Sequence, residues 1–288
     1  MATLEFRKMH GLGNDFVVLD GRERVIPMTG VLARAIGDRH TGVGCDQIIV
    51  LEPPRTPDAA LLMRIFNADG TEAGACGNAT RCVASLVMEE TGERRLGIET
   101  ISGVLPAMRA GGRLIAVDMG LARLRWRDIP LAAAVDTSAA PAGIDEGLGP
   151  ACCTSMGNPH ATFFVPDADA VDLARLGPIL ERHSLFPERA NIGIASLLGP
   201  DRLRLRVWER GVGLTLACGS GACAAVVAAA RRGITGRRAE IVMERGSLSI
   251  AWEPNGHVLM TGPVATSFRG TLDLAALERD AADVAALA

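Results

Sequence analysis

The chain has no tyrosine and only one lysine, Lys8. Pyridoxal phosphate is held in enzymes as a Schiff base on a lysine. Lys8 lies in a short predicted strand near the N-terminus, so we expect no pyridoxal cofactor. A phosphate-binding loop of the Walker type also needs a lysine after its glycines, and none is available away from Lys8. Without tyrosine, any contact between two copies of the chain must use other residues.

Blocks of positive charge and long apolar runs are also missing. The net charge is −3, with no cluster of lysines and arginines, so we expect no nucleic-acid partner. No apolar run reaches the roughly 18 residues that a membrane helix requires, so we expect no membrane partner. Residues 1–20 carry Glu5, Arg7, Lys8 and Asp15 where a secretion signal needs apolar residues. We therefore expect a cytoplasmic protein.

Metal-binding patterns are absent as well. The seven cysteines form no Cys-x-x-Cys pair, and none of the five histidines stands at ligand spacing from a cysteine. We therefore expect no metal site. An odd number of cysteines without an export signal indicates reduced thiols.

What the sequence does contain is one phrase written twice, Ala75-Cys76-Gly77-Asn78 and Ala217-Cys218-Gly219-Ser220. The two cysteines (76 and 218) are 142 residues apart, as are the residues nine positions before them (67 and 209). Asn14 and Asn158 are 144 apart, and so are Gln47 and Asn191. A period this long is typical of two equivalent domains.

Segments rich in small apolar residues follow both cysteines. Residues 79–90 and 221–230 are predicted to be buried helices. Cys76 and Cys218 would then lie at the first turn, where free N–H groups and the helix dipole lower a thiol pKa and bind a carboxylate. The other cysteines lack this setting and are predicted to be packing residues: Cys45, Cys82, Cys152, Cys153 and Cys223. Further expected elements are two strands within 4–19, a helix over 29–38, a strand over 47–51, an irregular segment over 130–150 and an amphipathic helix over 272–288.

The duplication also weighs against ordinary explanations. A lone cysteine is usually a small buried apolar residue, and a single asparagine is usually a turn residue. A papain-like nucleophile could use His160 and Asn158, but it would leave the second Cys-Gly phrase unexplained. Glu209 and Arg210 suit an ammonium and a carboxylate on a substrate.

Two thiols on opposite sides of one carbon could remove a proton and return another. The result is inversion at a carbon next to a carboxylate, by general base and general acid. Helix N–H groups would stabilise the extra negative charge of the transition state. We expect this active site in the cleft between the two domains.

The sequence resembles the diaminopimelate epimerase family over nearly its whole length. The resemblance rests on residues 11–16, 40–47, 66–70, 157–160, 209–211 and 217–223. It implies pyridoxal-independent interconversion of LL- and meso-2,6-diaminopimelate, in lysine and peptidoglycan precursor biosynthesis, with no cofactor. The implied fold class is α/β (α+β), with two pseudo-symmetric domains, each a curved mixed sheet wrapped around a central helix. The expected domains are 1–120 with 265–288, and 121–264. A homodimer is also implied.

The resemblance also implies residue roles. Cys76 and Cys218 match the acid/base pair, and Glu209 and His160 match positions that support the cysteines. The matched substrate-binding positions are Asn14, Gln47, Asn67, Gly77, Asn78, Asn158, Asn191, Glu209, Arg210, Gly219 and Ser220. Local departures from the family pattern are Gly74, Ala79 and Leu214. The alternatives are another cofactor-free isomerase, of the proline-racemase or phenazine-biosynthesis type, and a non-catalytic amino-acid-binding protein.

Overall fold

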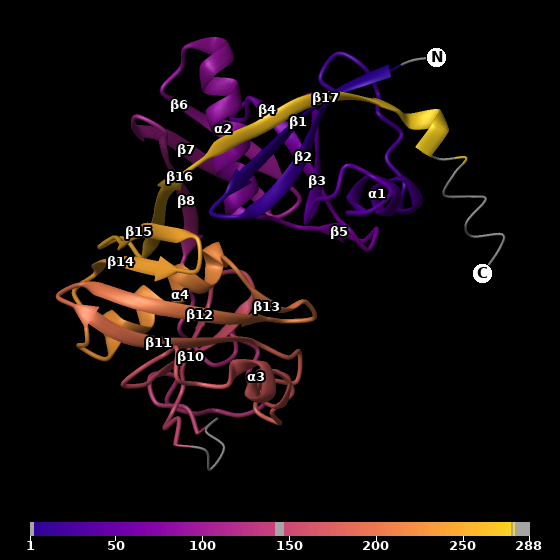
Figure 1. The fold of residues 1–288 in the computed structure, drawn as a ribbon. Coiled ribbons are helices and arrows are strands. Elements are labelled where there is room, and N and C mark those ends of the chain that lie inside the picture. The colour runs from indigo at the N-terminus through magenta and orange to yellow at the C-terminus, as the bar shows by residue number, and fades with distance from the viewer. Residues whose placement is uncertain (1–2, 142–146, 278, 280–288) are drawn as a thin grey trace. The chain divides into compact units, whose positions relative to one another are not determined.

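The computed structural model describes residues 3–141, 147–277 and 279. The chain divides into two compact units, Met1–Val117 together with Pro263–Ala288, and Asp118–Gly262 (Figure 1). Each unit contains a curved sheet, a long central helix and a shorter helix on the outer face of the sheet.

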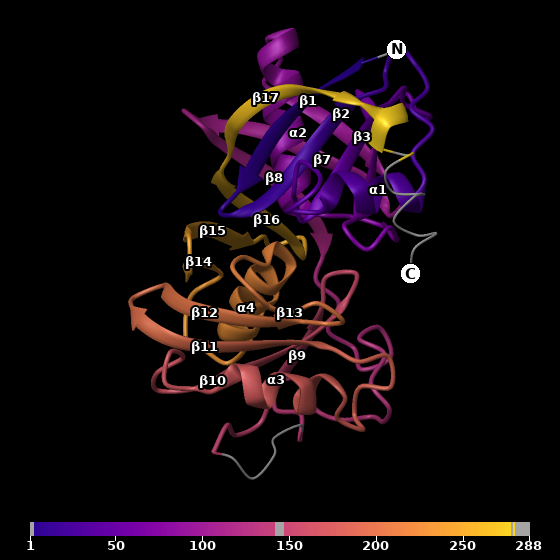
Figure 2. The same ribbon diagram turned by 45° about the vertical axis from the view of Figure 1, so that its right-hand side comes forward.

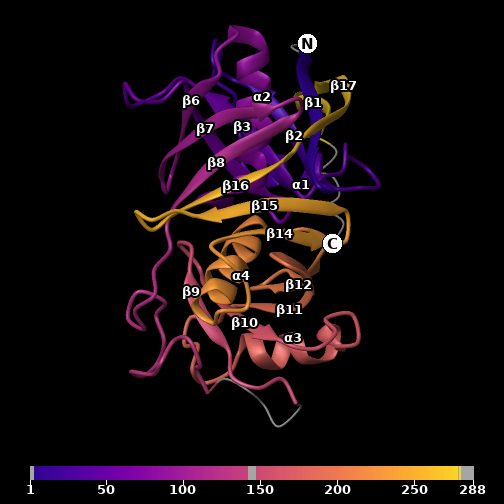
Figure 3. The ribbon, with the colours of Figure 1, turned by 90° about the vertical axis from the view of Figure 1, so that its left-hand side faces the viewer.

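The sheet of the first unit is mixed. Its strands are β1 (Thr3–Gly11), β2 (Asn14–Asp20), β3 (Gln47–Glu52), β4 (Leu61–Asn67), β5 (Glu72–Ala73), β6 (Arg95–Thr100), β7 (Gly103–Gly111), β8 (Leu114–Leu121) and β17 (Ala265–Asp273). The pairs β2–β3 and β4–β6 are parallel, and the other pairs within this unit are antiparallel. Helix α2 (Gly77–Thr91) contacts β1, β2, β6 and β7, so the sheet curves around it (Figure 3).

Helix α1 (Gly30–Gly37) packs on the opposite face of the same sheet. Its Leu32 and Ile36 join a core with Ile48 and Val50 of β3. Successive side chains of a strand point to opposite faces, which leaves Ile49 and its neighbours for the face that α2 covers. This explains why β3 is a continuous apolar run.

The second unit repeats this plan. Its strands are β9 (Cys152–Ser155), β10 (Pro159–Phe164), β11 (Asn191–Gly199), β12 (Arg202–Glu209), β13 (Gly213–Thr215), β14 (Arg238–Met243), β15 (Gly246–Trp252) and β16 (His257–Pro263). Helix α4 (Gly219–Arg231) contacts β9, β10, β11, β12, β14 and β15 (Figure 2). Helix α3 (Leu173–Glu181) packs against β11, β12 and β13.

Each described strand pairing within the second unit has a counterpart in the first, which also contains the pair β1–β17. Parallel β2–β3 and β4–β6 in the first unit match parallel β10–β11 and β12–β14 in the second. In both units a short strand just before the central helix, β5 or β13, pairs antiparallel with the strand that precedes it in the chain, β4 or β12. The expected fold class is therefore confirmed, with two repeated halves that each wrap a sheet around a helix.

Most predicted helices are confirmed. Thr29 caps α1 by accepting a hydrogen bond from Leu32 N at 3.1 Å. Helices α2 and α4 begin directly after Cys76 and Cys218, and α2 ends at Thr91 and is capped by Gly92, whose φ of 76° suits glycine. Helix α3 was not predicted, because Gly177 and Pro178 inside it weaken the helical pattern.

The prediction of a terminal helix from residue 272 is wrong at its start. Leu272 and Asp273 end β17, where Leu272 pairs with Leu4 of β1. Residues 274–277 are helical. Residues 278 and 280–288 of the predicted helix lie outside the described residues.

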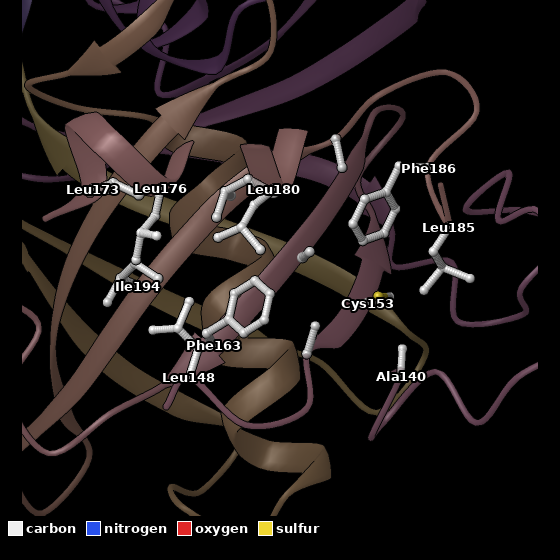
Figure 4. Close-up of a cluster of buried hydrophobic side chains, with 14 of the residues drawn as sticks. Ala140, Leu148, Cys153, Phe163, Leu173, Leu176, Leu180, Leu185, Phe186 and Ile194 are labelled. Carbon is white, nitrogen blue, oxygen red and sulfur yellow. The ribbon is translucent and has the colours of Figure 1, made fainter. Parts of the chain in front are cut away.

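A buried cluster fixes α3 to the sheet of the second unit. Leu176 and Leu180 of α3 pack with Phe163 of β10 and Ile194 of β11 (Figure 4). All four side chains are at most 4% exposed, and burial of such side chains stabilises the fold by about 1.5–3 kcal/mol each. The cluster therefore holds α3 and its last residue, Glu181, in a fixed position.

Among the described helices, none is long and apolar enough to cross a membrane.

Candidate functional site

In the first unit, Cys76 stands immediately before α2 and is half-buried. Its Sγ lies 3.8 Å from Asn14 Oδ1, which can accept the thiol proton. The same oxygen accepts a hydrogen bond from Asn78 Nδ2 at 3.1 Å. Asn14 Nδ2 in turn donates to Asp46 Oδ2 at 2.9 Å. Three predicted site residues therefore meet around one oxygen atom.

Two further predicted residues of this unit form a pair. Gln47 Nε2 donates to Asn67 Oδ1 at 2.9 Å, and Asn67 Nδ2 donates to Thr71 Oγ1 at 3.0 Å. Two buried oxygens, Gln47 Oε1 and Asn78 Oδ1, accept no hydrogen bond from any described residue. Buried acceptors of this kind are costly unless a donor meets them. They could accept the N–H groups of an ammonium ligand.

In the second unit, Cys218 stands before α4 and connects to a row of polar groups. Its Sγ lies 3.7 Å from Ser220 Oγ. Asn158 Nδ2 donates to Ser220 Oγ at 3.5 Å, and Asn158 Oδ1 lies 3.0 Å from His160 Nε2. His160 therefore reaches the Cys218 region through Asn158 and Ser220, whereas the sequence predicted support of a cysteine without this relay.

Glu209 ends β12, and Arg210 begins the turn that follows. Thr215 of β13 donates its hydroxyl proton to Glu209 Oε1 at 2.6 Å. Asn191 Oδ1 accepts from Arg210 N at 2.9 Å, while Asn191 Nδ2 donates to Pro159 O at 3.0 Å. The side chain of Asn191, predicted to bind substrate, thus also joins the backbones of two site segments.

The pKa of Cys218 differs from the sequence-based expectation. Burial raises the pKa of this thiol well above its usual value, and the nearby Glu209 carboxylate raises it further. The N–H of Gly221 in the first helical turn lowers the pKa, as expected from the helix N-terminus, but this effect is smaller. The prediction of a lowered pKa is therefore wrong for Cys218, because desolvation of the thiolate outweighs the helix terminus.

His160 is held neutral. It is 2% exposed, and burial, followed by the positive charge of Arg210, lowers its pKa to about 3. A neutral imidazole can accept and donate a hydrogen bond at the same time, which suits a place in a polar relay.

Both cysteines leave a helix terminus available to an anion. Neither side chain caps its helix with a hydrogen bond of ordinary geometry, although the Gly221 N–H is near enough to Cys218 to lower its pKa. The first N–H groups of a helix bind a carboxylate well when no side chain caps them. In α4 the Cys218 thiol packs closely against the first helical turn, because a Cβ on Gly221 would lie 3.2 Å from Cys218 Sγ. Gly77, Asn78, Gly219 and Ser220 all belong to these first turns, as predicted.

A cavity of about 200 Å³ lies beside Cys218 within the second unit. Its lining includes Val207, Leu214, Leu216 and Met243. Leu214, one of the departures from the family pattern, therefore contributes apolar surface to a cavity that Cys218 also lines.

Cofactor and metal ligands can be judged from the side chains. The only lysine, Lys8, forms an ion pair with Asp15 at 2.6 Å and donates to the carbonyl of Gly44, so it is committed to protein partners. Within the part of the chain that the structure describes, no group of three or more His, Cys, Asp or Glu residues could hold a metal ion. All seven cysteines are thiols, and the five predicted to be packing residues are buried.

Sequence reasoning missed several residues that touch the predicted site, among them Asp46, Thr215, and Thr71, which accepts from Asn67. Asp46 binds Asn14, and Thr215 binds Glu209. Asp46 precedes Gln47 directly, so adjacency to a predicted site residue was the available signal. Thr215 is brought to Glu209 by the pairing of β12 with β13, which no local pattern announces.

Comparison with known proteins adds sequence relatives. The family model for diaminopimelate epimerase matches residues 6–125 and 152–267. A diaminopimelate epimerase from Rhodospirillum centenum is 64% identical over 268 residues, covering 93% of this chain and 91% of the relative. One from Acidiphilium cryptum is 58% identical and covers 96% of this chain and 99% of the relative.

Solved structures add a likeness of fold. A probable proline racemase from Agrobacterium radiobacter matches with a TM-score of 0.68 at 18% identity, covering 94% of this chain and 93% of that chain. A phenazine biosynthesis protein from Enterococcus faecalis also reaches a TM-score of 0.68, at 14% identity, covering 94% and 99%. The two alternative isomerase classes therefore share the fold with this chain.

Proposed function

Because the chain belongs to the diaminopimelate epimerase family, we propose that it interconverts LL- and meso-2,6-diaminopimelate by proton transfer between two cysteines. The observation that carries the proposal is that each of the two repeats starts its central helix directly after a cysteine. Identities of 64% and 58% to diaminopimelate epimerases support this substrate over those of the fold relatives. The reaction serves lysine and peptidoglycan precursor synthesis.

The proposed chemistry places the substrate α carbon between Cys76 and Cys218. One sulfur removes the α proton as a thiolate, and the other thiol delivers a proton to the opposite face, which inverts the carbon. The raised pKa of Cys218 keeps this thiol protonated at neutral pH, which suits a proton donor. In the direction of reaction in which Cys218 donates the proton, Cys76 is the base. In the reverse direction the two roles exchange.

The N–H groups of the two helix termini are proposed to hold the carboxylate at the reacting carbon. Gly77 and Asn78 contribute from α2, and Gly219 and Ser220 from α4. As the α proton leaves, negative charge grows on this carboxylate, so donors that are already oriented stabilise the transition state more than the ground state. This takes the place of the electron-withdrawing cofactor that many racemases use.

The rest of the substrate is proposed to bind the polar side chains of both units. Amide oxygens such as Gln47 Oε1 accept from an ammonium, and the Arg210 guanidinium pairs with a carboxylate. Asn14, Asn67, Asn158, Asn191 and Glu209 complete the proposed set, with His160 acting through Asn158. A substrate with an amino acid group at each end can use all of these contacts, whereas proline has only one such end.

The proposal includes a cytoplasmic location and a homodimer. Seven cysteines that are all thiols suit a reducing compartment. Sedimentation equilibrium of the purified chain tests the dimer.

Incubation with LL-diaminopimelate in D₂O, without pyridoxal phosphate, tests the function. We expect the meso isomer to form with deuterium at the inverted carbon, and NMR measures both the isomer ratio and the deuterium content. Folded, reduced protein that neither inverts nor exchanges the α proton would overturn the proposal. Exchange of the α proton of proline, without exchange in diaminopimelate, would support the proline-racemase class instead.

A further inference from the structure

Glu181, the last residue of α3, is a buried carboxylate that the proposed mechanism does not use. Its side chain is 5% exposed. Burial of a carboxylate is unfavourable unless donors surround it. Its donors therefore indicate what it is there to hold.

Two donors of Glu181 flank the segment that carries Glu209 and Arg210, and a third partner, Arg189, forms an ion pair with it, Nη1 to Oε1, at 3.7 Å. Trp208 Nε1 donates to Glu181 Oε2 at 2.7 Å, and Gly211 N donates to Glu181 Oε1 at 3.1 Å. One carboxylate thus binds the residue before Glu209 and the residue after Arg210. These are the two ends of the turn.

The same residue also fixes the turn that faces Arg210. Ala190 N donates to the backbone carbonyl of Glu181 at 3.2 Å. Next to it, Asn191 Oδ1 accepts from Arg210 N at 2.9 Å, and Glu188 O accepts from Arg210 Nη1 at 3.0 Å. Arg189 lies between them with a φ of 60°, a backbone conformation that needs support in a residue other than glycine.

The indole of Trp208 is held against α3 as well. A Cβ at Gly177 would lie 2.4 Å from Trp208 Cδ2, so the ring packs directly on the helix where a side chain is missing. The ring position then sets where Nε1 points, and Nε1 points at Glu181.

We propose that Glu181 is a positioning residue that holds Arg210 for substrate binding through the Gly211 N–H and the Trp208 indole. The proposal rests on the proposed function, in which Arg210 binds a substrate carboxylate. Glu209 has its own anchor in Thr215, so loss of Glu181 affects substrate binding more than proton transfer.

The variant Glu181→Gln tests this directly. A glutamine has one acceptor in place of two, so its Nε2 would face either Trp208 Nε1 or Gly211 N, both of which are donors. We expect KM for LL-diaminopimelate to rise about tenfold while kcat changes by less than about threefold. A role in stability alone would lower the active fraction, and therefore kcat, at unchanged KM.

The double variant Glu181→Gln/Trp208→Phe tests the donor match. Phenylalanine keeps most of the ring but removes Nε1, so the introduced glutamine can accept from Gly211 N without opposing a second donor. We expect the KM of the double variant to lie closer to wild type than that of Glu181→Gln alone. Glu240→Gln is the matched control, because Glu240 lies in the same unit in an exposed ion pair with Arg202 and should leave KM unchanged.

An unchanged KM in Glu181→Gln, or a fall in kcat alone, would overturn the proposal. A double variant no better than Glu181→Gln would do the same. If Glu181→Gln does not fold, Trp208→Phe alone decides, with a KM raised about threefold in support and a wild-type KM against. Inactive wild-type protein would instead contradict the proposed function, and the positioning role would fall with it.

Discussion

Thr215 donates its hydroxyl proton to Glu209 at 2.6 Å, and Glu209 is in turn one of the groups that raise the pKa of Cys218. A hydroxyl on the short strand β13 is thereby connected to the protonation of a proposed catalytic thiol. The connection exists because β13 pairs antiparallel with β12, which places Gly213–Thr215 beside Val207–Glu209.

Removal of this hydroxyl should impair catalysis. In Thr215→Val the shape of the side chain is kept, but Glu209 loses a charge-assisted hydrogen bond. We expect kcat to fall about tenfold, measured by conversion of LL- to meso-diaminopimelate. Thr271→Val, on an exposed position of β17, is the control and should be fully active. Full activity in Thr215→Val would show that Glu209 needs no such anchor.

Both cysteines should be required for epimerisation. Cys76→Ala and Cys218→Ala each remove one acid/base group, so we expect kcat to fall at least about a hundredfold in each variant, with far-UV circular dichroism unchanged. Cys82→Ala is the matched control, since Cys82 is buried on the helix that follows Cys76 and should cost only about 1 kcal/mol of stability. Near-normal turnover in either single variant would contradict the two-thiol mechanism.

A methyl group at position 221 should displace the Cys218 thiol. The added Cβ would lie 3.2 Å from Cys218 Sγ and 3.1 Å from Val207 Cγ2. We expect Gly221→Ala to lower kcat about tenfold and to cost about 1–3 kcal/mol of stability through overpacking. Gly199→Ala is the control, because nothing lies within 4 Å of its added Cβ. Equal activities of the two variants would argue against a tight fit at Cys218.

The buried His160 should make stability depend on pH. Its pKa is lowered to about 3 by burial and by Arg210, whereas in the unfolded chain it is about 6.5. Above about pH 6.5 the imidazole is neutral in both states, and below it the unfolded chain binds a proton that the folded chain does not. Stability should therefore fall as the pH drops from about 6.5 toward 3.

Urea unfolding of wild type and His160→Gln measures this contribution. Between pH 7 and about pH 4.5 we expect wild type to lose about 2 kcal/mol more than the variant, because glutamine does not titrate. If both proteins lose the same free energy, His160 is not the group responsible.

Some of the site was predictable because it is encoded locally. The phrase around each cysteine is duplicated, and the glycine and alanine residues that follow favour a helix that starts there. The structure confirms both helix starts, at Gly77 and Gly219. The roles of the individual residues stay predictions, since they depend on substrate.

Other features depend on residues that are distant in sequence. Leu272 and Asp273 look helical by pattern, yet their pairing with β1 at the other end of the chain overrides that preference. Helix α3 forms despite Gly177 and Pro178, because its apolar face packs on the sheet. Burial against neighbouring elements outweighs weak local propensity.

The sequence alone determined the repeat and the place of each cysteine at a helix start, because these follow from residue types at fixed spacing, and its resemblance to a known family implied the fold class. The tertiary structure decided which side chains bind one another and in which direction the pKa of a proposed catalytic thiol is shifted. It placed Asp46 on Asn14 and Glu181 on Trp208, and it raised the pKa of Cys218 where the helix terminus alone would lower it. Desolvation depends on everything packed around a group, and that becomes known only when distant segments meet.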